Sequence, residues 1–162
     1  MPINQSEQRL LPSLLDRLID FNPLSATESV KSQSQLIQEM KVSLRRDLEN
    51  LLNTRWPCIS WPPQYEELEL SLINYGIPDF TGVNMGGPDN QKRLMQIVKH
   101  AIEKFEPRLL KFSIEIKSET DNINRTLSFR VDGLLRAEPY PEQVMFDTAL
   151  DIHSSEFEVK SS

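Results

Sequence analysis

The sequence has little cysteine and histidine, and it has no long apolar run. Its one cysteine, Cys58, finds no second cysteine in the chain with which to form a disulfide. Cys58 and the two histidines, His100 and His153, are too few for the usual four-ligand zinc site. No stretch approaches the run of about 18 apolar residues that marks a membrane-spanning helix. The sequence therefore predicts no internal disulfide, no metal site and no membrane span.

Motifs for nucleotide binding and nucleophilic catalysis are missing as well. The chain contains no GxGxxG, no P-loop and no GxSxG pattern. The pattern favours a solvated or capping role for His100 and a structural, buried role for Cys58. The first residues lack the basic segment and apolar core of a secretory signal, so we expect a cytoplasmic protein. No cofactor and no catalytic residue is predicted.

The charge is unevenly distributed. The 162 residues carry a net charge of −6, and residues 137–162 hold six acidic residues against one basic residue. A protein that binds nucleic acid broadly needs a basic surface, which this composition does not provide. The acidic end of the chain would suit a basic partner instead.

Helical periodicity dominates the first two thirds of the sequence. Apolar residues recur at three- and four-residue steps in 10–19, 34–53 and 89–105, and a shorter helix is expected at 65–73. Ser34 is the expected N-cap of the second helix, and Asp89 or Asn90 that of the last one. Gly76 suits the left-handed residue after a helix.

After Pro107 the period changes to two. Leu110–Lys117, Leu127–Asp132 and Gln143–Leu150 alternate apolar and polar residues, and Phe157–Val159 adds a short last strand. Helices followed by a strand meander predict an α+β fold with the N-terminal helices packed on one face of a small antiparallel β-sheet. A polar, serine-rich stretch divides the chain into a helical arm and linker, residues 1–33, and a single α+β domain, residues 34–162.

Paired carboxylates are a candidate glycosidase site, since glycoside hydrolysis needs only two. Nothing in the sequence places one of these acids in an apolar pocket that would keep it protonated. The sequence therefore favours a non-enzymatic protein over a muramidase. The acids considered were Glu66, Glu67, Glu69, Asp79, Glu103 and Glu106.

The tripeptide Glu106-Pro107-Arg108 is the most informative local feature. Proline fixes its own φ, so an acid and a base are held on a preset backbone. Such a pair can dock on a partner with little loss of entropy. It can equally be a helix-to-strand corner with an ordinary surface ion pair. The residues alone leave both alternatives open.

Six segments, in order, resemble one known family. They are LLPSLLDRLID (10–20), SLRRDLENLLNTR (43–55), ELSLINYGIPDFTG (69–82), IEKFEPRLL (102–110), LSFRVDGLL (127–135) and PEQVMFDTAL (141–150). On these segments the chain resembles the TssE family of type VI secretion baseplate subunits. That family belongs with the contractile-phage baseplate wedge protein, sometimes labelled lysozyme-like.

The resemblance implies a structural role without catalysis. It implies the TssF and TssG baseplate subunits as partners, the TssB and TssC sheath proteins above them, and TssK as a further candidate. It also implies that the family's Glu-Pro-Arg motif, here Glu106, Pro107 and Arg108, contacts baseplate partners. The same fold family contains an anti-adaptor that regulates proteolysis, so a regulatory binding module remains the alternative.

An open sheet edge could also pair with a partner's strand. The Gln143–Leu150 strand is the last long strand, so the sequence predicts it as the edge.

Overall fold

The structure is a computed structural model. It describes residues 13–19, 32–57, 62, 64, 65, 67, 68, 71–80, 87–117, 126–138 and 140–161. The helices are α1 (Leu14–Leu18), α2 (Gln33–Asn53) and α3 (Pro88–Phe105), with a 3₁₀ turn, η3 (Leu72–Asn74). The strands are β1 (Leu109–Ile116), β2 (Thr126–Leu135), β3 (Glu142–Asp151) and β4 (Glu156–Ser161).

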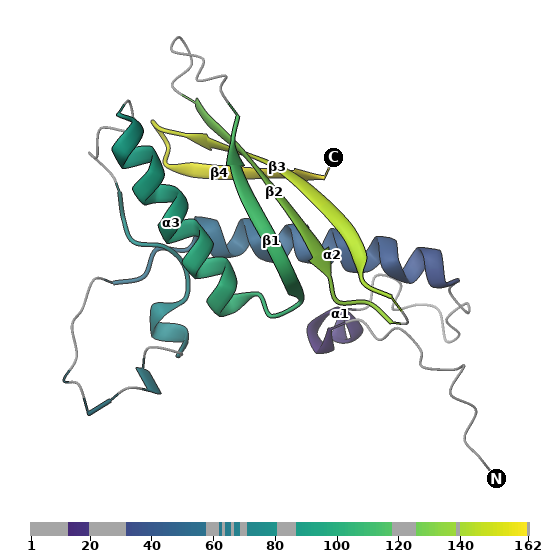
Figure 1. The fold of residues 1–162 in the computed structure, drawn as a ribbon. Helices are drawn as coiled ribbons and strands as arrows, with labels where there is room; N and C mark the ends of the chain where they lie inside the picture. The colour runs from purple at the N-terminus through teal and green to yellow at the C-terminus, as the bar shows by residue number, and fades with distance from the viewer. Residues whose placement is uncertain are drawn as a thin grey trace.

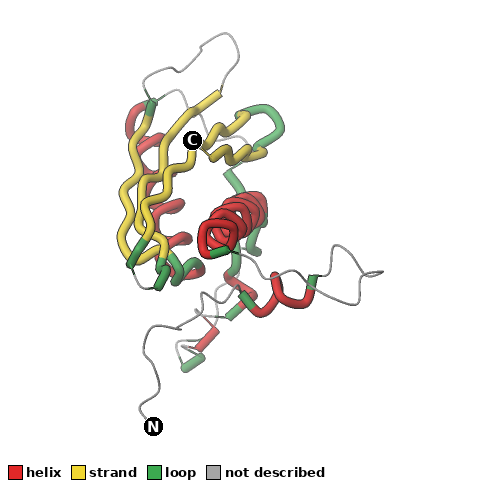
Figure 2. Tube along the Cα trace, turned by 90° about the vertical axis from the view of Figure 1, so that its right-hand side faces the viewer, coloured by secondary structure: helices red, strands yellow, loops and turns green. Residues whose placement is uncertain are grey.

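The four strands form one antiparallel sheet in the order β1-β2-β3-β4, so each strand pairs with its neighbour in sequence (Figure 1). Helices α2 and α3 pack against this sheet, and Figure 2 shows α2 nearly end-on beside the strands. The predicted α+β class is confirmed.

The core lies between the sheet and the two long helices. The alternation along β2 and β3 places every second side chain inward, as the burial of Phe129 and Phe146 shows. Helix α2 contributes a leucine stripe of four buried residues, Leu44, Leu48, Leu51 and Leu52. Helix α3 contributes Leu94, Val98, Ala101 and Ile102.

Both long helices begin earlier than the sequence predicts. The N-cap of α2 is Ser32 and not Ser34, because Ser32 and Gln35 form a reciprocal capping box. Helix α3 begins at Pro88 after Gly87, and not at an Asp89 or Asn90 cap. Proline fits the first helical position, where its missing N–H needs no partner.

The prediction that Gln143–Leu150 is an edge strand is wrong. Strand β3 pairs with β2 along its whole length and with β4 from Phe146 to Asp151. The short segment at the end of the chain forms a strand of its own, β4, and covers most of the far side of β3. The two edge strands are therefore β1 and β4.

A close backbone approach explains the shape of the turn after η3. Ile77 donates its N–H to Thr54 O at 3.0 Å and forms a parallel bridge with Arg55. Gly76 beside it has φ +109°, and a Cβ there would lie 2.2 Å from Thr54 O. Only glycine fits this position without moving the backbone.

Part of the predicted 65–73 helix lies outside the described residues, as does Cys58; the described part ends in η3. None of the helices in the described ranges combines the length and apolar character needed to cross a membrane.

Candidate functional site

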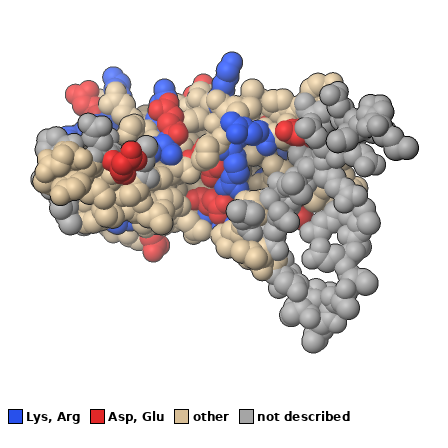
Figure 3. All heavy atoms as spheres, turned by 90° about the horizontal axis from the view of Figure 1, so that it is seen from below, with Lys and Arg blue, Asp and Glu red and all other residues tan. Residues whose placement is uncertain are grey.

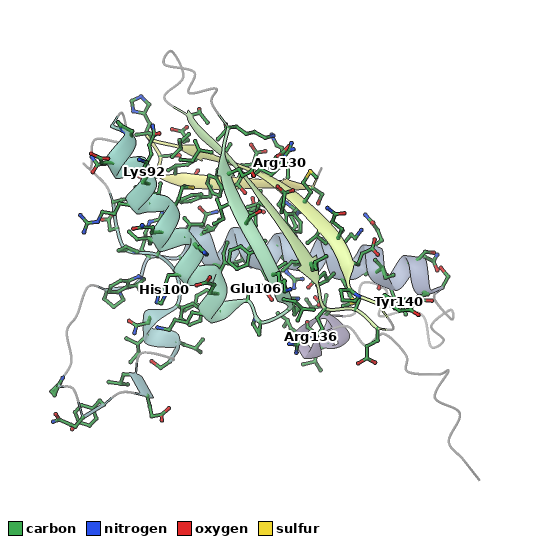
Figure 4. The ribbon with its side chains drawn as sticks, viewed as in Figure 1. Lys92, His100, Glu106, Arg130, Arg136 and Tyr140 are labelled. Atoms are coloured by element: carbon green, nitrogen blue, oxygen red, sulfur yellow. The ribbon has the colours of Figure 1, made fainter. Side chains whose placement is uncertain are left out.

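The Glu106-Pro107-Arg108 corner joins α3 to β1. The N–H of Glu106 still bonds to Ile102 O at 2.9 Å, and the helix ends there because the residue before a proline avoids the helical region. Arg108 O accepts the N–H of Arg136 at 2.7 Å, which ties the corner to the end of β2. Figure 4 shows Glu106 between the end of α3 and the start of β1, with Arg136 nearby.

Glu106 and Arg108 form a two-pronged ion pair. Arg108 Nε donates to Glu106 Oε1 and Arg108 Nη2 donates to Glu106 Oε2, each at 2.6 Å. The Glu106 side chain is only 6% exposed, and that of Arg108 is 25% exposed. This is therefore a part-buried pair inside the chain and not an ordinary surface ion pair.

The pair continues into α2. Arg108 Nη2 also donates to Asp47 Oδ2 at 2.7 Å, and Arg108 Nη1 reaches Ser43 Oγ at 3.3 Å. Ser43 and Asp47 lie four residues apart, so they occupy one face of α2. All three guanidinium nitrogens of Arg108 thus have partners within the chain.

A second arginine extends the network to α1. Asp16 of α1 accepts a hydrogen bond from Ser43 Oγ at 2.6 Å and from Arg46 Nη2 at 2.9 Å. Arg46 also pairs with Asp47 at 3.0 Å. Three carboxylates and two guanidinium groups therefore join α1, α2 and the corner. Figure 3 shows acidic and basic side chains adjoining on the face seen from below.

The pKa values reflect this arrangement. Burial opposes the charge of Arg108, but the bonds and charges of Glu106 and Asp47 outweigh it and raise the pKa of the guanidinium. Burial likewise opposes ionisation of Asp16, yet hydrogen bonds from Ser13, Ser43 and Arg46 hold the pKa of its carboxyl below the usual value. Burial, followed by the carboxylates of Asp47 and Glu106, raises the pKa of Tyr75.

The sequence identified Glu106 and Arg108 but missed the three α2 residues that hold Arg108 and α1. Ser43, Arg46 and Asp47 are not among the site residues that the sequence predicts. The available signal was a Ser and an Asp at four-residue spacing directly beside the leucine stripe. Periodicity alone does not reveal that Arg108, 61 residues further on, meets Asp47.

The other candidates are scattered. His100 and His153 are exposed, and Glu103 is an exposed residue 3.8 Å from Lys99. Glu67 and Asp79 are exposed too, whereas Glu66 and Glu69 lie outside the described residues. Glu106 is buried, and both of its carboxylate oxygens accept hydrogen bonds from the Arg108 guanidinium.

An open groove of about 930 Å³ lies where the end of α2 meets β4. Acidic side chains line it, among them Glu49, Asp151 and Glu156. No cluster of three potential metal ligands occurs among the residues that the structure describes.

Comparison with protein families gives a match to the baseplate wedge protein gp25 family over residues 38–140. That range includes α2 from residue 38 onward, all of α3 and the Glu106–Arg108 corner. No curated protein matches the chain. A chain in the solved structure of the baseplate complex from the type VI secretion system is 15% identical. The similarity covers 69% of this chain and 94% of that chain, with a TM-score of 0.46.

Proposed function

The chain belongs to the baseplate wedge protein gp25 family, and from this premise we propose that it is a structural subunit of a contractile baseplate. The observation that carries the proposal is the family match, which spans most of α2 and all of α3, β1 and β2. The proposal implies that the protein is not an enzyme. The buried Glu106 carboxylate forms an ion pair with Arg108. Such an internal contact suits a structural subunit.

More specifically, we propose a type VI secretion baseplate. The six sequence segments that resemble the TssE family support this assignment. In it, the chain joins the TssF–TssG wedge and seats the first ring of the TssB–TssC sheath, and TssK is a further candidate partner. Residues 1–33 serve as an arm and residues 34–162 as the wedge domain. A cytoplasmic location stays part of this prediction.

The corner residues Glu106, Pro107 and Arg108 are proposed as part of the wedge-binding surface. Since Arg108 is held by Glu106 and Asp47, it has no free two-pronged face for a partner's carboxylate. The corner then contributes a fixed shape, in which Pro107 is exposed and the backbone direction is set. A partner would bind this corner by its shape, and Arg108 would stabilise the conformation of the corner.

Co-purification tests the proposal. The tagged chain is co-expressed with TssF and TssG, with and without TssB and TssC, and the complexes are separated by size. We expect a complex with TssF–TssG in both cases. When TssB and TssC are co-expressed, we expect them to join that complex. Failure to bind either TssF–TssG or the sheath subunits would overturn the assignment.

A second assay tests the absence of catalysis. Purified protein on a peptidoglycan zymogram should give no clearing, and Glu106→Gln should behave the same. Dose-dependent clearing that one glutamate substitution abolishes would show a hydrolase instead.

A further inference from the structure

The outer edge of β4 is occupied by side chains of α2. In an antiparallel ladder, both backbone groups of one residue face the neighbouring strand, and those of the next face away. The N–H and C=O of Phe157, two residues before Val159 on β4, point away from β3 and toward α2. On an uncovered edge strand, such groups form a ready template for another strand.

Asn53 takes the place of that strand at Phe157. Its Nδ2 donates to Phe157 O at 2.9 Å, and its Oδ1 accepts the Phe157 N–H at 2.8 Å. A side-chain amide carries one acceptor and donors on a planar group, as a peptide bond does. Asn53 therefore makes with Phe157 the same pair of bonds that a partner strand would make.

Arg45 covers the next outward position. Its Nη1 donates to Val159 O at 3.0 Å, and the same nitrogen is held by Glu49 at 3.2 Å. Arg45 and Asn53 lie two turns apart on α2, and Phe157 and Val159 are successive outward residues of β4. Helix α2 thus binds both backbone groups of Phe157 and the carbonyl oxygen of Val159 at this edge.

The opposite edge lacks such a cover. Lys117, just after β1, donates its N–H to Ser128 O at 2.9 Å, so by alternation Phe112, Ile114 and Ile116 direct their backbone groups away from β2. Among the described residues, no side chain forms a comparable two-bond clamp on these positions. Within the part of the chain that the structure describes, side chains therefore bind the outward backbone groups at the β4 edge, and none does so at the β1 edge.

We propose that Asn53 and Arg45 are edge-selecting residues, which close β4 against pairing with an extended strand, including β4 of a second copy of this chain. Their removal would expose the backbone of Phe157 and Val159 and create a second sheet edge that can pair with another strand. The proposal concerns the isolated chain and does not depend on baseplate membership.

Amide hydrogen exchange tests the clamp. In Asn53→Ala/Arg45→Ala at low protein concentration, the Phe157 amide should exchange roughly two- to tenfold faster than in the wild type, because its acceptor is gone. The buried strand β2 should keep its protection. Unchanged exchange at Phe157 would show that the clamp does not close the edge.

Light scattering coupled to size exclusion tests the consequence. At increasing concentration, the double variant should reach a higher mass than the wild type, and its Phe157 amide should regain protection in the associated form. The matched control is Asn50→Ala/Arg93→Ala, which removes one exposed asparagine and one exposed arginine from helices. A folded double variant with the mass of the control would overturn the proposal, as would association that leaves Phe157 unprotected.

Asn53→Asp keeps the test valid if the double variant fails to fold. This substitution preserves the shape and the acceptor for the Phe157 N–H but removes the donor to Phe157 O. We expect a folded protein, checked by circular dichroism, with weaker association than the double variant but more than the control. A mass equal to that of the control would contradict the edge-selecting role.

Discussion

Glu106 illustrates how one buried carboxylate can organise a corner. Burying a carboxylate that is 6% exposed is costly unless opposite charge and hydrogen bonds compensate, and Arg108 supplies both. Arg108 in turn reaches Asp47 and Ser43 on α2. The side chains that hold Arg108 therefore come from two elements far apart in sequence.

This arrangement predicts a large stability loss for Arg108→Ala. The substitution leaves Glu106 buried without its partner, which typically costs about 3–5 kcal/mol. Urea denaturation should show this loss, whereas the exposed Arg136→Ala should stay within about 0.5 kcal/mol of the wild type. Adding Glu106→Gln to Arg108→Ala should recover part of the loss. A loss below about 1 kcal/mol for Arg108→Ala would show that Glu106 is not held as described.

Thr148 presents the opposite case, a polar group without a partner. Its side chain is 2% exposed on the core face of β3, and its Oγ1 has no hydrogen-bond partner among the described residues. Thr148→Val should therefore stabilise the fold by about 1 kcal/mol, since valine has the same shape and no group to desolvate. Thermal unfolding should shift upward by about 2–4 °C.

Thr54→Val provides the matched control for that measurement. The Thr54 hydroxyl donates to Asn50 O at 2.7 Å, so its loss should not stabilise the fold. A destabilised Thr148→Val would indicate that this hydroxyl has a partner after all.

The sequence predicts the identity of the corner residues but not their surroundings. Pro107 and the end of the apolar pattern at Phe105 locate the turn, because both are local properties. The burial of Glu106 depends on Asp47 and Ser43, which long-range packing brings to it. An acid and a base beside a proline suggest an exposed ion pair. In the folded chain, packing against α2 buries Glu106 instead.

At the scale of the elements, polar contacts hold helix α1 against α2. Asp16 binds Ser43 and Arg46, while Leu15 and Leu18 remain exposed. The folded-state pKa of Asp16 lies below the ordinary value of about 3.9. The stabilisation from this carboxylate is thus complete above that pH and is lost as the pH falls through the lowered pKa.

Asp16→Asn should reveal that dependence. At pH 7 the variant should be less stable than the wild type by about 1–3 kcal/mol, because charge-assisted hydrogen bonds are lost. As the pH falls through the lowered pKa of Asp16 the difference should shrink, since the wild-type carboxyl then becomes protonated too. Asp89→Asn, at an exposed position on α3, is the control. A difference that is independent of pH would contradict the charged contact.

The turn at Gly76 supplies a further prediction. Gly76→Ala should cost at least about 1–2 kcal/mol, because alanine at positive φ is strained and its Cβ would meet Thr54 O. Gly87→Ala is the comparison, since φ there is −93° and no atom lies within 4 Å of the added Cβ. Chemical denaturation should place the Gly76 variant clearly below the Gly87 variant. Equal stabilities would contradict the close approach.

Element types were more predictable than element boundaries. The periods of 3.6 and 2 depend on many residues at once, so they locate α2, α3 and the strands correctly. A cap depends on one or two residues, and the prediction of Ser34 missed the capping-box spacing from Ser32 to Gln35. The capping box with Gln35 decides between them.

Considered as a whole, the molecule has a sheet whose two edges differ. Strand order is not a property of any single strand, which is why alternation in Gln143–Leu150 revealed its inward face but not its central position. The added strand β4 covers it, and α2 covers β4. If the sheath is seated by strand pairing, the partner strand would therefore pair with β1.

Ile114→Pro tests this at the scale of the assembly. The Ile114 N–H points outward, so proline there should be compatible with the fold but remove a donor from the open edge. We expect near-native circular dichroism with loss of sheath assembly in cells. Ser113→Pro is the contrast, since its N–H faces β2 and its loss should disturb the sheet itself. Full sheath assembly with Ile114→Pro would exclude β1 as the docking edge.

The link between Asn53 and Phe157 also sets an order of events during synthesis. The two residues are 104 positions apart, and a ribosome adds roughly 5–20 residues per second. Helix α2 thus leaves the ribosome about 5–20 s before the strand that covers its leucine stripe. Over that interval β1, β2 and β3 can pair in turn, because each needs only its predecessor. The sheet of the nascent chain therefore lacks β4 until residues 156–161 emerge, and this is when we expect the chain to depend most on chaperones.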